Sequence, residues 1–178
     1  MKKRNILILA FLAVIIFGSS IAFTKEPPAK VYRYKVIKIQ DGDTFTATDG
    51  NLKFRVRIVG MDAPEKRQPY GKVASHRLSE MILNKDVEIT SVGRGMDRYG
   101  RILGIVSLGG ENIAINLIKQ GLATYYRPTC QDYPLGQKKY NYDPELYLKA
   151  ESQARKEKLN IWKTQVFIYP CKYRKMKK

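Results

Sequence analysis

The chain has 178 residues, which is enough for one domain with a hydrophobic core and too few for two domains of ordinary size. Its 33 Lys and Arg outnumber its 16 Asp and Glu, and the formal net charge of +17 favours a polyanionic partner such as nucleic acid or an anionic membrane surface. Two cysteines and one histidine, with no close spacing among them, make a poor zinc site.

The N-terminus has the pattern of a secretory signal peptide. A basic flank at residues 2–4 precedes an uninterrupted apolar run at residues 6–17, and Ser20 and Ala22 then suit the small positions of a cleavage site. We expect residues 1–22 to be a signal peptide that is cut after Ala22. An uncleaved anchor is the alternative, because the apolar segment approaches the roughly 18 residues that can span a membrane. Either outcome makes the folded part extracytoplasmic, as a secreted, periplasmic or anchored domain, because the positive flank stays inside.

The two cysteines, Cys130 and Cys171, would then lie in a compartment that permits disulfides. A bridge between them would tie the C-terminal segment to a loop, and the chain-entropy model assigns such a bridge about 4 kcal/mol. Two separate thiols are the alternative.

The segment that follows has the pattern of a β-rich domain, after a polar linker at residues 23–30 that contains two prolines. Alternating apolar residues, turn signals and helix caps predict five strands and three helices. The strands are expected at residues 32–39, 43–48, 52–61, 87–92 and 101–108, and the helices at residues 69–83, 112–120 and 143–160. This order predicts an α+β fold, and five short strands suit a small barrel that removes its own exposed edges.

Carboxylates at two predicted strand ends form the first part of a candidate site. Asp43 lies in the turn that begins with Asp41-Gly42, and Asp62 opens the corner Asp62-Ala63-Pro64-Glu65 after the third strand. Pro64 restricts the backbone on both sides, so that Asp62 and Glu65 leave the corner in defined directions. If the two strand ends meet, their hard oxygen ligands suit Ca²⁺ or Mg²⁺. Ordinary polar turns are the alternative for each motif alone.

Arginines form the second part of the candidate site. The segment Asp97-Arg98-Tyr99-Gly100-Arg101 carries two guanidinium groups, which can grip a phosphate with paired hydrogen bonds. A solvated charged loop is the alternative for this segment. Arg57 differs because it lies within an apolar strand, where an unpaired charge is costly. We therefore expect a carboxylate or a phosphate close to Arg57.

The ordered set of motifs resembles the thermonuclease family of staphylococcal nuclease-like proteins over nearly all of residues 32–162. The motifs are Asp41-Gly42-Asp43-Thr44, Arg57 with Asp62-Ala63-Pro64-Glu65, Asp97-Arg98-Tyr99-Gly100-Arg101, Gln120-Gly121-Leu122-Ala123 and the closing segment from Ala150 to Trp162. The resemblance implies an OB-fold five-stranded β-barrel with three α-helices. It also implies a Ca²⁺-dependent endonuclease that hydrolyses phosphodiester bonds of DNA and RNA.

The resemblance assigns a role to each residue of the metal-binding corner. Asp43 and Asp62 correspond to the calcium-binding carboxylates, and the main-chain carbonyl of Ala63 corresponds to the third protein ligand. Glu65 corresponds to the general base that orients or deprotonates the attacking water.

The resemblance also assigns the substrate contacts. Arg57 and Arg101 correspond to the two arginines that hold the reacting phosphate, and Arg98 and Tyr99 correspond to substrate-binding positions. Arg98 stands where a lysine is usual, which keeps the charge. A second tyrosine of the nucleotide pocket has no clean match, and Tyr126 stays unassigned.

The same resemblance sets the expected limits of the domain. We expect a thermonuclease-like domain at residues 31–162 and a basic, solvated C-terminal tail at residues 163–178. Tyrosines and lysines interleave in this tail, so contact with a single nucleic-acid strand is the alternative to a solvated tail. We expect a monomer without a stable protein partner, and a membrane contact only if the N-terminal segment is retained. A noncatalytic OB-fold module that binds nucleic acid and a membrane-bound basic adaptor are the alternatives, and neither predicts metal-dependent cleavage.

Overall fold

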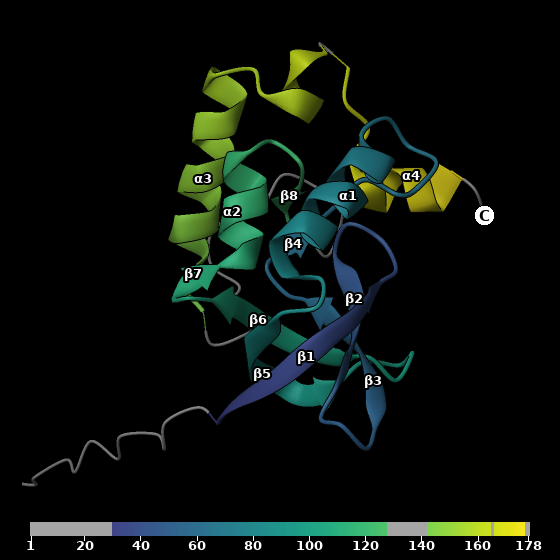
Figure 1. Cartoon of the computed structure of the whole chain (residues 1–178). Coiled ribbons are helices and arrows are strands. Elements are labelled where there is room, and N and C mark those ends of the chain that lie inside the picture. Colours follow the sequence, from purple (N-terminus) through teal and green to yellow (C-terminus); the bar gives the residue numbers. More distant parts are fainter. Residues whose placement is uncertain (1–29, 128–141, 165, 177–178) are drawn as a thin grey trace, which may run out of the picture.

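A closed barrel of five strands forms one half of the structure, a computed structural model that describes residues 30–127, 142–164 and 166–176 (Figure 1). Its strands are β1 (Val31–Ile39), β2 (Thr44–Thr48), β3 (Lys53–Ile58), β5 (Asp86–Met96) and β6 (Ile102–Leu108). They pair in the order β3-β2-β1-β5-β6, and a parallel pairing of β3 with β6 closes the barrel. Because of this closure, each of the five strands pairs with a neighbour on both sides. The structure thus confirms the predicted α+β OB-type barrel.

Four helices and three short strands complete the described part of the chain. The helices are α1 (Gly71–Ile82), α2 (Ile113–Lys119), α3 (Pro144–Lys156) and α4 (Pro170–Met176), and the 3₁₀ helix η1 covers Asn160–Lys163. The short strands are β4 (Met61–Asp62), β7 (Glu111–Asn112) and β8 (Thr124–Tyr125). Helices α2 and α3 pack side by side, whereas α1 and α4 lie at the end of the barrel where β4 begins (Figure 1).

Local capping explains where two of the helices begin. The side chain of Asn112 accepts a hydrogen bond from the Ile115 N–H at the start of α2. Asp143 accepts one from the Glu145 N–H at the start of α3, where Pro144 occupies the first helical position. Helix α3 ends at Lys156, a few residues before the predicted end.

Two features differ from the sequence-based expectation. Strand β5 continues to Met96 through part of the connection predicted at residues 93–100, because Gly93 and Gly95 adopt positive φ and the register with β6 shifts between Ser91 and Met96. Helix α4 lies within residues 163–178, where we expected a solvated basic tail.

The predicted signal peptide and Cys130 lie outside the described residues. No helix in the described ranges is long and apolar enough to cross a membrane.

One hydrophobic core fills the barrel and continues to the helices. Val36, Phe45 and Ile58 line the barrel interior with no exposed area, and Leu78 of α1 joins the same cluster.

Outside the barrel, the buried carboxylate of Glu151 on α3 forms a polar cluster with three groups. It accepts hydrogen bonds from the Nη2 of Arg127 at 2.9 Å, the Nη2 of Arg155 at 2.7 Å and the backbone N–H of Tyr125 at 3.2 Å.

The Glu151 cluster supplies a stability test. Glu151→Gln keeps the side-chain size and removes the charge that faces Arg127, so we expect a loss of about 3 kcal/mol in the free energy of unfolding, measured with urea. Glu157→Gln, an exposed change of the same kind at the end of α3, should alter it by about 0.5 kcal/mol or less. Equal losses in the two variants would contradict this role of Glu151.

Candidate functional site

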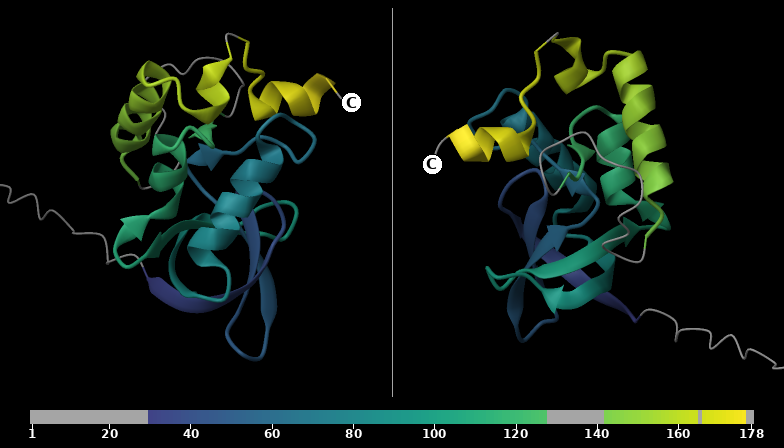
Figure 2. Two further views of the ribbon diagram at one scale, coloured as in Figure 1. Left: turned by 45° about the horizontal axis from the view of Figure 1, so that its top comes forward. Right: turned by 180° about the vertical axis from the view of Figure 1, so that it is seen from behind.

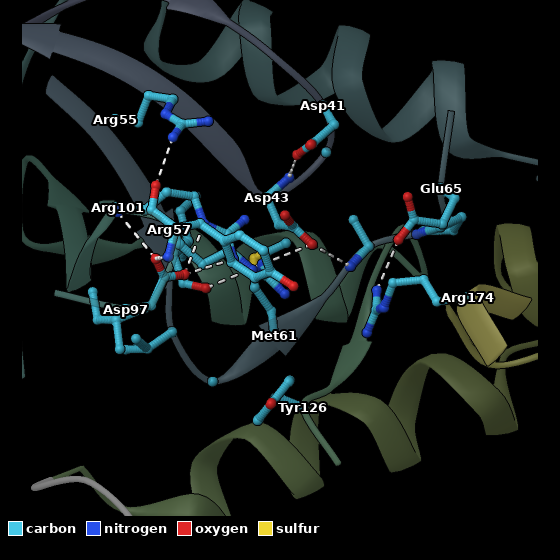
Figure 3. A pocket seen from close by; sticks show the side chains of 18 of the residues that line it. Asp41, Asp43, Arg55, Arg57, Met61, Glu65, Asp97, Arg101, Tyr126 and Arg174 are labelled. Carbon is cyan, nitrogen blue, oxygen red and sulfur yellow. Dashed lines mark hydrogen bonds and ion pairs between the residues drawn. The ribbon is translucent and has the colours of Figure 1, made fainter. Parts of the chain in front are cut away.

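A pocket of about 890 Å³ opens where β2 begins, where β3 ends and where the loop between β4 and α1 leaves the barrel (Figure 3). Ten of its lining residues are labelled in Figure 3 and come from five separate parts of the chain: Asp41, Asp43, Arg55, Arg57, Met61, Glu65, Asp97, Arg101, Tyr126 and Arg174. The pocket therefore joins residues from the first strand turn to the last helix.

Two buried carboxylates belong to this site: Asp43 lines the pocket, and Asp62 is paired with the lining residues Arg57 and Arg174. The side chains of Asp43 and Asp62 are 10% and 3% exposed. Asp43 accepts hydrogen bonds from the Thr44 hydroxyl at 3.0 Å and from the Ala63 N–H at 3.0 Å. A Cβ atom on Gly42 would lie only 2.6 Å from the Cβ of Ala63, so this glycine allows the first turn to approach the corner after β4.

Arg57 on β3 joins the two carboxylates. Its Nη1 lies 2.7 Å from Asp43 Oδ2, and its Nη2 lies 3.0 Å from Asp62 Oδ1, while its side chain is only 11% exposed. Burial disfavours the charge of Arg57, but Asp43 and Asp62 more than offset this effect and raise its pKa above the usual value. The carboxylate that we expected near Arg57 is thus present twice.

Glu65 stands at the mouth of the pocket after the Pro64 corner, with its side chain 39% exposed. Its backbone N–H donates to the Oε1 of Gln68 at 2.8 Å, which fixes the turn that leads into α1. Its Oε1 accepts a hydrogen bond from the Nη1 of Arg174 at 2.8 Å (Figure 3). The carboxylate assigned as general base is therefore held from both its backbone and its side chain.

Arg101 lies on the other side of the pocket, just before β6. Asp97 accepts from both the Nε and the backbone N–H of Arg101, at 2.8 and 3.0 Å, and the Nη1 of Arg101 lies 3.3 Å from the Thr44 hydroxyl. The parallel register of β3 with β6 pairs Arg57 with Leu103, two residues beyond Arg101. Barrel closure thus brings the two phosphate-binding candidates to neighbouring strands.

Tyr99 forms an exposed aromatic platform beside Arg101. It is 57% exposed, and the guanidinium carbons of Arg98 and Arg101 lie 4.9 and 5.5 Å from the centre of its ring. The Nη2 of Arg55 on β3 donates to the carbonyl of Tyr99 at 2.6 Å. The loop with both predicted substrate-binding residues is therefore tied to the barrel wall.

The concentration of acidic groups raises two pKa values. Burial and the nearby charge of Asp43 raise the pKa of Asp41 to about 6. Burial raises the pKa of Asp62 above its usual value, although Arg57 and Arg174 oppose this effect. For both carboxyl groups, burial thus outweighs the nearby positive charge.

The acidic end of the pocket fits a divalent cation. Four carboxylates, those of Asp41, Asp43, Asp62 and Glu65, face the guanidinium groups of Arg57 and Arg174, which leaves two negative charges uncompensated. All candidate ligands there are oxygens, which suits Ca²⁺. No group of three or more Asp, Glu, His or Cys side chains with metal-binding geometry occurs among the described residues. A site of two carboxylates and one main-chain carbonyl is consistent with that finding.

Four pocket or support residues were not assigned from the sequence: Arg55, Gln68, Tyr126 and Arg174. Tyr126 follows β8 and lines the pocket, which places the tyrosine that the sequence comparison left unassigned. Arg55 has a local signal, because it lies two residues before Arg57 on the same strand. Arg174 has no such local signal, because nothing in the sequence distinguishes it from the other basic residues near the C-terminus. Cys171 is buried in α4, and its predicted bridge to Cys130 stays a prediction.

Comparisons with known proteins agree with this geometry. Residues 55–164 match the family model described as staphylococcal nuclease homologue. An uncharacterized endonuclease of Haemophilus influenzae is 32% identical, over 100% of this chain and 89% of that protein. A thermonuclease of Staphylococcus hyicus is 34% identical, over 91% of this chain and 99% of that protein. A micrococcal nuclease of Shigella flexneri is 31% identical, with 83% of each chain covered.

The raised pKa of Asp41 predicts a dependence of stability on pH. In the folded protein the pKa of Asp41 is about 6, whereas the ordinary pKa of an aspartate is 3.8. Asp41 therefore destabilises the fold once it loses its proton, and this destabilisation develops as the pH rises from about 3.8 to about 6. In chelator, Asp41→Asn should therefore match the wild type in unfolding free energy at pH 4 and exceed it by roughly 1–3 kcal/mol at pH 7.5. Denaturant unfolding at the two pH values measures both differences.

Asp49→Asn is the control with the opposite sign. Backbone hydrogen bonds from Leu52 and Asn51 lower the pKa of Asp49, so its contribution is present at neutral pH and lost as the pH falls. This variant should be less stable than the wild type at pH 7.5 and approach it at low pH. The same trend in both variants would contradict the assignment for Asp41.

Proposed function

Because the chain belongs to the staphylococcal nuclease family, we propose that it is a Ca²⁺-dependent nuclease that hydrolyses phosphodiester bonds of DNA and RNA. The observation that carries this proposal is the convergence of a carboxylate base, two buried carboxylates and two arginines at one site: Glu65, Asp43, Arg57 and Arg101 line one pocket, and Asp62 is paired with Arg57. These groups come from distant parts of the chain, and core packing alone does not require them to meet.

Asp43, Asp62 and the carbonyl of Ala63 would hold the metal ion. Asp43 and Asp62 share contacts with Arg57, and the Ala63 N–H donates to Asp43, so the three residues lie around one point. A bound Ca²⁺ supplies positive charge that stabilises the phosphoryl oxygens during the reaction.

Arg57 and Arg101 would hold the reacting phosphate. Guanidinium groups stay charged at neutral pH and donate paired hydrogen bonds to phosphoryl oxygens. Their side chains are 11% and 23% exposed, and such shielding from water strengthens their attraction for the negative charge that develops in the transition state. Their own carboxylate partners, Asp43 and Asp97, fix the orientation of both groups before substrate binds.

Glu65 would act on the attacking water. Its partly exposed carboxylate accepts a proton from the water as the oxygen bonds to phosphorus, the ester P–O bond breaks, and the departing oxygen takes a proton from solvent. The backbone hydrogen bond to Gln68 and the side-chain hydrogen bond from Arg174 restrict the directions that Glu65 can adopt.

The proposed substrate contacts suit DNA and RNA equally. The phosphodiester is common to the two polymers, and the exposed ring of Tyr99 can stack on a base or sugar of either. The flanking cations Arg98, Arg101 and Arg55 suit the backbone of a single strand that crosses the pocket.

The test is cleavage of single-stranded DNA and RNA by the purified protein with Ca²⁺ and then with a chelator. We expect degradation only with metal, a fall in kcat of about 10²–10⁴-fold in Glu65→Gln, and a clear loss of kcat/KM in Arg101→Gln. Glu157→Gln and Arg33→Gln, two exposed changes of matching charge, should leave both parameters nearly unchanged. Binding without cleavage under all divalent ions would instead support a noncatalytic OB-fold module.

We also propose that the domain acts outside the cytoplasm. The basic flank at residues 2–4 and the apolar run at residues 6–17 support this proposal. In cell fractionation of the native host, the protein should appear outside the cytoplasm, and Edman sequencing of the mature chain should start at Phe23. A full-length chain in the membrane fraction would indicate the uncleaved anchor, and a cytoplasmic chain would contradict the proposal.

A further inference from the structure

Helix α4 brings an arginine into the pocket from outside the region that matches the family model, which ends at residue 164. The Nη1 of Arg174 donates to Asp62 Oδ1 at 3.1 Å and to Glu65 Oε1 at 2.8 Å, and its Nη2 donates to Asp62 Oδ2 at 3.0 Å. Figure 3 shows its side chain pointing toward Glu65. One guanidinium thus spans a candidate metal ligand and the candidate base.

The backbone of Glu65 is tied to the same C-terminal segment by Gln68. The Oε1 of Gln68 accepts from the Glu65 N–H at 2.8 Å, and its Nε2 donates to the carbonyl of Ile168 at 2.9 Å. Gln68 is only 6% exposed, so both hydrogen bonds are shielded from water. The segment before α4 therefore contacts the Glu65 turn independently of Arg174.

Packing also holds the start of α4 in place. The ring of Tyr169 lies 5.7 Å from Phe167 and 6.4 Å from Trp162, and the hydroxyl of Tyr169 accepts a hydrogen bond from Arg155. Pro170 and Cys171 at the start of the helix are buried. Helix α4 lies beside the loop between β4 and α1 (Figure 2), and the aromatic contacts of Tyr169 hold the segment just before it in addition to the ion pairs of Arg174.

We propose that Arg174 is a positioning residue that holds the Glu65 carboxylate in its working orientation, and that the C-terminal segment supports the active site through Arg174 and the carbonyl of Ile168. The inference rests on the proposed function, in which Glu65 acts on the attacking water. Glu65 is 39% exposed on a loop, and without a fixed partner its side chain would sample several rotamers. The planar fork of an arginine fixes direction as well as charge, whereas a lysine supplies charge alone.

The charge of the pocket allows Arg174 and a divalent cation to be present together. The two negative charges left at the acidic end remain with Arg174 in place, and a divalent ion matches them. Asp62 Oδ2 accepts one hydrogen bond, from Arg174, and each carboxylate oxygen has two acceptor positions. Arg174 therefore completes the site without using all the ligand capacity of Asp62.

The first experiment compares Arg174→Gln with Lys172→Gln, which removes the same charge from an exposed position of α4. With saturating Ca²⁺ and a single-stranded DNA substrate, Arg174→Gln should lower kcat by about 10- to 100-fold and change KM by less than about threefold. Lys172→Gln should leave both parameters within about twofold. Arg174→Lys should restore part of the lost kcat, because it returns the charge without the fork.

Two further measurements separate positioning from other roles. In the Glu65→Gln background, Arg174→Gln should lower the residual rate by less than about threefold, because the group that Arg174 orients is already absent. Calcium affinity, measured by isothermal titration calorimetry without substrate, should stay within about threefold of the wild type in Arg174→Gln. Thermal unfolding of each variant shows whether a lost rate reflects a lost fold.

Several results would overturn the inference. Wild-type kcat in a folded Arg174→Gln, or a full additional loss in the Glu65→Gln background, excludes positioning through Glu65. A higher kcat together with tighter Ca²⁺ binding would make Arg174 an inhibitory internal cation. If Glu65→Gln itself cleaves at the wild-type rate, the proposed function fails instead, whatever Arg174 does.

Discussion

The ion pairs of Arg57 with Asp43 and Asp62 are the interaction on which the rest of the pocket depends. Arg57 is nearly buried, and its two partners come from the first strand turn and from the strand that follows β3. Without the positive charge of Arg57 between them, the buried carboxylates of Asp43 and Asp62 would repel each other, and each would favour its neutral form. Arg57 thus keeps a potential metal site charged and holds three separate segments at one point.

Barrel closure supplies the second constraint. The parallel pairing of β3 with β6 brings Arg101, just before β6, close to the strand that carries Arg57, although 44 positions separate the two residues in the chain. The same closure allows Arg55 to reach the carbonyl of Tyr99, which ties the aromatic platform to the wall of the barrel. A shift of this register by one residue would turn these side chains to the other face of the sheet. The side of the pocket that carries Arg57, Tyr99 and Arg101 is therefore a direct result of the strand register.

The C-terminal segment adds a third constraint at the side of the pocket where Glu65 lies. Gln68 and Arg174 hold the backbone and the side chain of this residue, and both contacts depend on residues 166–176. This support lies outside the matched family region, which ends at residue 164. In this protein, the pocket is thus built by the barrel on one side and by a short terminal helix on the other.

Much of the barrel and of its candidate site could be predicted from the sequence, because the signals are local. Alternation defines the strands, Asp143 and Pro144 mark the start of α3, and the Pro64 corner identifies its two carboxylates. The fourth helix and the role of Arg174 could not be predicted in this way, since α4 has only seven residues and Arg174 is one of several basic residues there. Its contact with Glu65 joins residues 109 positions apart. The sequence by itself thus determined the candidate residues of the site, whereas tertiary packing decided which of them meet, because such distant contacts leave no periodicity in the chain.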